Sequence, residues 1–162
     1  MDYWFSAHEV AQLAAEIESK GAVFYRHLQD VADDATIADM CAFFVAQEDE
    51  HHTKFLAIAE AYRTSECEQW YSVDIGEMLK ASISDMAQFC DGENLAARSL
   101  ATVSECLSLA ARLEATAIRV YTQMGEKYTA RFSGILSEVL EEEQKHLRMI
   151  QHVQKRIQPA VT

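Results

Sequence analysis

The chain has 162 residues and a hydrophobic content of 49%, with 26 acidic against 14 basic side chains, a formal charge of −12. This length is close to that of one domain, and the hydrophobic content excludes disorder as the main state. An acidic surface repels phosphate groups, so we expect neither nucleic acid nor a membrane as a partner. The single proline favours long helices over a fold with many strands. We therefore predict an all-α protein in which residues 1–162 form one domain.

The N-terminus and the cysteines indicate a cytoplasmic protein. The first residues lack the basic region and apolar stretch of a secretory signal, and no window approaches the 18 apolar residues of a membrane span. No cysteine belongs to a Cys-x-x-Cys pair, which excludes zinc-ribbon and rubredoxin-type sites. We expect free thiols at all four positions, Cys41, Cys67, Cys90 and Cys106.

The first half of the chain predicts a helix hairpin over residues 6–62. Ser6 and Glu9 form a capping box, and apolar residues then recur at spacings of three and four. Acidic and small residues over 30–34 indicate a turn, after which Asp34 is expected to cap the second helix.

A connection over residues 63–101 follows. Residues 64–74 have the composition of a loop, whereas 75–101 indicate two short helical pieces with a break near Asp91 and Gly92. A connection of this length can run the whole length of a helical bundle. The second helix pair can therefore join the bundle through a crossover connection rather than in simple up-and-down order.

The second half predicts another hairpin, over residues 102–157. Thr102 and Glu105 repeat the capping box, the third helix extends to about Tyr128, and the last helix ends before Pro159. Each hairpin alone would leave its apolar stripe in water, so we expect the two to pack as a four-helix bundle.

The two hairpins repeat one pattern. A shift of 96 residues carries Ser6, Glu18 and Tyr25 onto Thr102, Glu114 and Tyr121. A shift of 95 carries Glu48 and His51 onto Glu143 and His146. The repeat therefore places two related helix pairs in one domain.

Polar residues interrupt the apolar stripes at equivalent places. In the second helix Glu48 and His51 occupy consecutive core positions, and the register with the flanking phenylalanines selects His51 rather than His52. The last helix has Glu143 and His146 at the same places, while Glu141 and Glu142 are interpreted as a solvated charge run. With one glutamate from each remaining helix, we expect six side chains to converge: Glu18, Glu48, His51, Glu114, Glu143 and His146.

Such a cluster predicts a paired metal site. Burying four unpaired carboxylates is strongly unfavourable, whereas two divalent cations supply the four positive charges that balance them. Glu-x-x-His places an oxygen and a nitrogen donor on one helical face, and a donor set without thiolate favours iron or manganese over structural zinc. Tyr25 and Tyr121 can donate hydrogen bonds to ligand carboxylates. The small Gly21 and Ala117 leave room for metals or a small substrate.

The segments that contain these residues resemble the diiron domain of the rubrerythrin family, within the ferritin-like superfamily. The resemblance covers residues 6–62 and 102–157 and is carried by Glu18–Tyr25, Gln47–His51, Leu113–Tyr121 and Glu141–His146. It implies a ferritin-like four-helix bundle of two hairpins with a long, partly helical crossover connection. It also implies that two irons are bridged by Glu48 and Glu143, with Glu18, His51, Glu114 and His146 as outer ligands. Which histidine binds which iron stays open.

Two features depart from that family. The sequence has no four-cysteine rubredoxin-like domain, and Ala117 stands where the family has a further glutamate. The resemblance therefore implies a diiron oxidoreductase, active in oxidative stress, that reduces hydrogen peroxide or dioxygen with electrons from a separate donor protein, rubredoxin-like or other. We expect two iron ions as cofactor, for which manganese or zinc can substitute, and a homodimer.

Two alternatives use the same residues differently. The site can act as a ferroxidase for iron storage or transfer, which needs a cage or an acceptor. Alternatively, the bundle is a non-catalytic module in which metal is structural or absent.

Overall fold

The computed structural model describes residues 5–64, 70–90, 103–127 and 130–157, and this part of the chain is mostly helical. Five helices account for nearly all of it: α1 (Ala7–Val31), α2 (Ala35–Arg63), α3 (Val73–Cys90), α5 (Val103–Lys127) and α6 (Ala130–Ile157). The strands β1 (Phe5–Ser6) and β2 (Trp70–Tyr71) form a small antiparallel ribbon. None of the helices in these ranges combines the length and apolarity that a bilayer crossing requires.

The predicted caps of the first two helices are confirmed. The Ser6 hydroxyl accepts from the Glu9 amide at 3.2 Å, and the Glu9 carboxylate accepts from the Ser6 amide at 2.9 Å. The Asp34 carboxylate accepts from the Thr36 and Ile37 amides, which satisfies donors that have no partner within the helix. The second predicted capping box begins at residue 102, outside the described residues.

The predicted loop over 64–74 is partly wrong. Within it lie β2 and the first turn of α3, and Tyr71 pairs with Phe5 near the N-terminus. Tyr71 is fully buried and donates its hydroxyl to the carbonyl of Met124. Local composition does not reveal such a long-range pairing. α3 extends to Cys90, and the predicted break at Asp91 and Gly92 and the second predicted helical piece lie outside the described residues.

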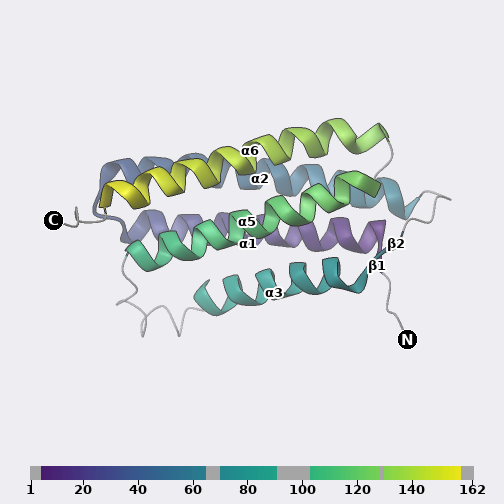
Figure 1. Cartoon of the computed structure of the whole chain (residues 1–162), viewed down its shortest axis with the longest axis horizontal. Coiled ribbons are helices and arrows are strands. Elements are labelled where there is room, and N and C mark those ends of the chain that lie inside the picture. The colour runs from purple at the N-terminus through teal and green to yellow at the C-terminus, as the bar shows by residue number, and fades with distance from the viewer. Residues whose placement is uncertain (1–4, 65–69, 91–102, 128–129, 158–162) are drawn as a thin grey trace.

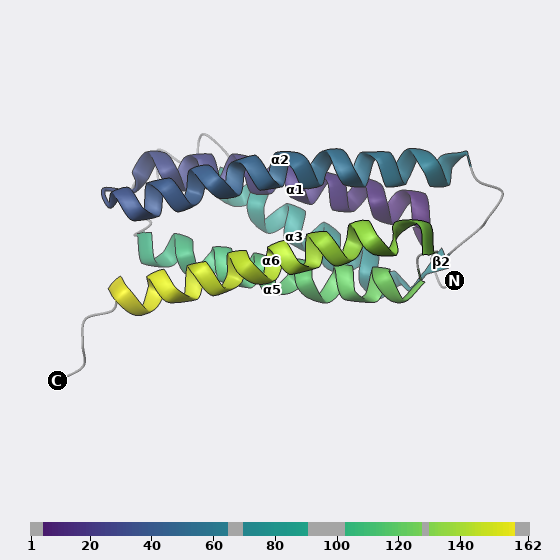
Figure 2. The same cartoon turned by 90° about the horizontal axis from the view of Figure 1, so that it is seen from above.

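Figures 1 and 2 show α1, α2, α5 and α6 lying side by side along the long axis of the molecule. α1 packs along α2, and α5 packs along α6. α3 packs against both α1 and α5, on the side away from α2 and α6 (Figure 1). α3 begins at the end of the molecule where α2 ends and runs to the opposite end. α5 therefore begins at the same end of the molecule as α2 (Figure 1).

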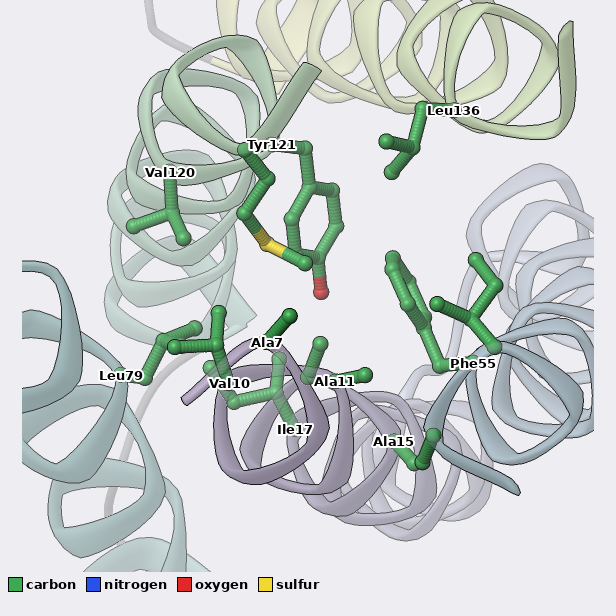
Figure 3. Close-up of a cluster of buried hydrophobic side chains, with 14 of the residues drawn as sticks. Ala7, Val10, Ala11, Ala15, Ile17, Phe55, Leu79, Val120, Tyr121 and Leu136 are labelled. Atoms are coloured by element: carbon green, nitrogen blue, oxygen red, sulfur yellow. The ribbon is translucent and has the colours of Figure 1, made fainter. Parts of the chain in front are cut away.

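Buried apolar side chains form two clusters. Figure 3 shows one of them, in which Leu79 and Phe55 lie on either side of α1 and Leu136 lies across the core from it. Tyr121 of α5 directs its hydroxyl toward α1. The second cluster contains the free, buried thiols of Cys41 and Cys106. Each of α1, α2, α5 and α6 contributes residues to both clusters. In each helix the polar residues that interrupt the apolar stripe lie between its residues of the first cluster and its residues of the second. The apolar core therefore encloses a polar centre.

Candidate metal centre

All six predicted ligands are buried, with exposed fractions between 0% and 4%. Four helices contribute them, as the repeat predicts: Glu18 from α1, Glu48 and His51 from α2, Glu114 from α5, and Glu143 and His146 from α6. In each helix the flanking apolar residues face the core. The polar residues lie at the same helical spacing, on the same face, and therefore also point inward.

The six residues form two groups that share two members. One group contains Glu18 and His51, the other contains Glu114 and His146, and Glu48 and Glu143 belong to both. Within each group the ligand atoms all lie within 4.8 Å of one another, so each group can hold one metal ion.

Three buried atoms that face this space have no hydrogen-bond partner: Nδ1 of His51, Nδ1 of His146 and Oε1 of Glu143. The His51 nitrogen lies 2.9 Å from Glu143 Oε1, and the His146 nitrogen lies 3.3 Å from Glu143 Oε2, but neither contact has the geometry of a hydrogen bond. Unpaired donors and acceptors are costly inside a protein. A cation between these atoms would satisfy all three, so the residues present fit a metal pair.

The other nitrogen of each imidazole is held from outside the cluster. His51 Nε2 lies 2.7 Å from Glu142 Oε2, and His146 Nε2 lies 2.7 Å from Gln47 Oε1. Such a partner fixes the tautomer, because a proton on Nε2 leaves the Nδ1 lone pair directed into the site. Glu142 is therefore not the solvated residue that its charge run indicated.

The two tyrosines donate hydrogen bonds to the glutamates. Tyr25 donates to Glu114, and Tyr121 donates to Glu18, so each hydroxyl binds the glutamate of the other helix. Burial raises the pKa of both hydroxyls well above the ordinary value, and the bonded carboxylates raise the pKa further. Both tyrosines therefore keep the proton that they donate.

The four buried glutamates have different pKa values, two raised and two lowered. Burial raises the pKa of Glu48 well above its ordinary value, and the charges of Glu18 and Glu143 raise this pKa further. Burial together with the charge of Glu143 raises the pKa of Glu114 to about 8. Burial also acts to raise the pKa of Glu18, but its contacts with Glu48 and His51 outweigh this and lower it. Glu143 likewise has a lowered pKa because its contacts with the histidines outweigh burial.

Both histidines hold protons strongly when no metal is bound. Burial acts to lower the pKa of His51, but the carboxylates of Glu143 and Glu18 outweigh it and raise the pKa to about 11. Burial is likewise outweighed at His146, whose pKa rises to about 9 through Glu114 and Glu143. Protons therefore occupy the cluster in place of a cation, and metal binding has to displace them.

A cavity of about 30 Å³ adjoins the carboxylates, with room for one or two water-sized molecules. Gly21 and Ala117 line it, as do Glu48, Glu114 and Glu143. A further lining residue is Ser82 of α3, which is 7% exposed and donates its hydroxyl to the carbonyl of Met78. The repeat does not predict Ser82 as a site residue, because the connection has no counterpart within it.

Two histidines outside the cluster bind backbone carbonyls between α1 and α2. His8 Nδ1 lies 2.8 Å from the Ala59 oxygen, and His52 Nδ1 lies 2.7 Å from the Ala15 oxygen. Both rings are half-buried. His52 is thus used in helix packing, while its neighbour His51 faces the cluster.

No protein-family model matches the chain, and comparisons with curated proteins and with solved structures likewise find no match. We therefore infer function from the geometry and chemistry of the buried cluster.

Proposed function

We propose that this protein is a rubrerythrin-like, non-haem diiron oxidoreductase with a ferritin-like four-helix bundle. In this proposal it reduces hydrogen peroxide or dioxygen with electrons from a separate donor protein. The observation that carries the proposal is the sharing of Glu48 and Glu143 between two four-residue groups of oxygen and nitrogen donors. Shared carboxylates hold two metals side by side, and a donor set without thiolate suits iron.

The chain's own residues prepare this centre. The unpartnered Nδ1 atoms of His51 and His146 and the carboxylates of Glu18 and Glu114 would hold the two metals together with the shared glutamates. Two ferrous ions, when bound, supply the two electrons that reduce one peroxide to two waters.

The surroundings limit what reaches the centre. The cavity beside Glu48 and Glu114 is large enough for peroxide or dioxygen but not for an organic substrate. The two apolar clusters exclude bulk water from both ends of the centre. Ala117 lines the cavity where the rubrerythrin family has a further glutamate, so this chain uses six ligands.

Stopped-flow oxidation of anaerobically iron-loaded protein tests the proposal. We expect about two ferrous ions per chain, with oxidation by hydrogen peroxide much faster than oxidation by dioxygen. Comparable rates with both oxidants, continued iron uptake and a 24-subunit shell on a sizing column would instead show iron storage. A lack of iron-linked absorbance, together with unchanged stability on chelation, would reject both functions.

A further inference from the structure

A groove of about 650 Å³ lies between α2 and α6, two helices that lie next to each other in both overall views (Figures 1 and 2). It is separate from the metal centre and uses none of the six ligands. Its lining residues are Thr36, Asp39, Met40, Phe43, Lys145, Arg148, Met149, His152 and Val153.

The groove presents apolar side chains to solvent. Phe43 is 47% exposed and Met149 is 37% exposed, and the buried Met40 and Val153 lie beneath them. Exposed apolar side chains gathered in one hollow are typical of interaction sites.

The α6 side of this groove is basic, although the whole chain is acidic. Residues 144–157 contain four basic residues and no acidic one, while the formal charge of the chain is −12. Lys145 and Arg148 line the groove, whereas Arg156 is paired with Asp34. The single acidic lining residue is Asp39 on α2. An acidic partner therefore meets a more favourable charge on this side of the groove than the net charge of the chain would give.

The groove also connects the surface with the metal centre. The exposed ring of Phe43 lies 6.3 Å from the ring of His146, centroid to centroid, in an edge-on arrangement. The His146 ring faces Glu48, Glu114 and Glu143 with its Nδ1 atom. A single ring contact thus separates the exposed groove from a ligand.

We propose that this groove docks an acidic protein that carries a one-electron redox centre and presents an apolar side chain toward Phe43. The inference rests on the proposed function, because it assigns the site at which the donor of electrons binds. A second copy of this chain fits less well, because a two-fold interface here would bring together two grooves that each have the same basic α6 side.

The electron count fits repeated docking. Each encounter transfers one electron from the reduced partner, so two encounters restore the two electrons that one peroxide consumes. The two protons that complete the two water molecules come from solvent. A contact that forms and dissociates for each electron needs fast association, which opposite charges provide.

Titration of the iron-loaded protein with an oxidised rubredoxin, a small acidic one-electron carrier, measures docking without turnover. We expect the dissociation constant to rise about tenfold in the Lys145→Glu/Arg148→Glu variant, and also between low and about 0.3 M salt. Phe43→Ala removes the apolar contact and should weaken binding about tenfold. Arg112→Glu reverses an exposed charge on α5 outside the groove and should change the constant by less than about threefold.

Equal effects of the groove variants and of Arg112→Glu would overturn the proposal, as would tighter binding of a basic cytochrome c. Loss of self-association in Phe43→Ala, with unchanged rubredoxin binding, would overturn it in favour of a second copy. Peroxide oxidation of the dithionite-reduced, unaltered protein is measured separately, and it should stay unchanged in Arg112→Glu. If the unaltered chain fails that oxidation, the proposed function fails, whereas the docking result is decided by the titration alone.

Discussion

Tyr25 in α1 donates its hydroxyl hydrogen bond to Glu114 in α5 rather than to Glu18 in its own helix. Tyr121 in α5 donates in return to Glu18. α1 and α5 run in opposite directions (Figure 1), so the tyrosine of each helix lies opposite the glutamate of the other. The two hydrogen bonds therefore tie the two halves of the repeat together across the cluster.

Removing one of these donors should destabilise the protein. Tyr25→Phe leaves the buried Glu114 carboxyl group without its hydroxyl donor, and an unsatisfied buried acceptor costs about 1–3 kcal/mol. We expect the free energy of unfolding to fall by about that amount in urea denaturation. In a double-mutant cycle with Glu114→Ala, which removes the acceptor, Tyr25→Phe should cost less than it does in the unaltered chain. Strict additivity would show that the bond contributes nothing.

The outer partners of the imidazoles should control metal affinity without binding metal. Glu142→Gln replaces a carboxylate by an amide at His51 Nε2, which makes the ring a weaker ligand. We expect the affinity of one of the two metals to fall about 10-fold or more in a metal titration. Glu141→Gln, at the neighbouring exposed position, is the matched control and should leave both affinities unchanged. Equal effects of the two variants would assign the change to net charge.

Gly21 allows the Glu48 carboxylate to approach α1 closely. A Cβ at this position would lie 3.2 Å from Glu48 Oε2 and 3.3 Å from Cδ, so the carboxylate would have to move by a few tenths of an ångström. We expect Gly21→Ala to weaken metal binding, since Glu48 belongs to both groups. Gly134→Ala, where a Cβ meets nothing within 4 Å, should raise the free energy of unfolding by about 0.5–1 kcal/mol and leave metal binding unchanged. Unaltered metal binding in Gly21→Ala would contradict the placement of Glu48.

Metal binding should release protons near neutral pH. The raised pKa values of His51 (about 11), His146 (about 9) and Glu114 (about 8) mean that these groups are mostly protonated at pH 7 without metal. Metal has to displace those protons, so its affinity should fall as the pH is lowered. Calorimetric titrations in two buffers with different ionisation enthalpies measure the release directly. We expect at least about one proton per metal, and no buffer dependence would contradict the protonation pattern.

The sequence predicts the helical elements and the inward stripes because each depends on short-range spacing. The four-and-three steps through Phe44, Glu48, His51 and Phe55 require these residues to share one face, and all four are buried. The caps at Ser6 and Asp34 likewise depend on neighbours within three residues.

The sequence pattern does not predict how the helices are directed and packed relative to one another. The crossed tyrosine bonds depend on the relative direction of α1 and α5, and Ser82 reaches the cavity only because α3 packs on both helices. One signal for the outer partners was present. Gln47 and Glu142 each directly precede a shared glutamate, so the repeat extends by one position toward the N-terminus of each Glu-x-x-His motif.

Metal stoichiometry in ligand variants tests most directly whether two groups share Glu48 and Glu143. Metal-free protein is titrated anaerobically with ferrous iron, and the bound metal is counted after desalting. We expect about two ions per chain in the unaltered protein, about one in Glu18→Ala, and none bound tightly in Glu143→Ala, because Glu143 belongs to both groups and Glu18 to one. Circular dichroism verifies that each variant is folded. Two ions retained by folded Glu143→Ala, or no stoichiometric metal in the unaltered chain, would contradict the shared site.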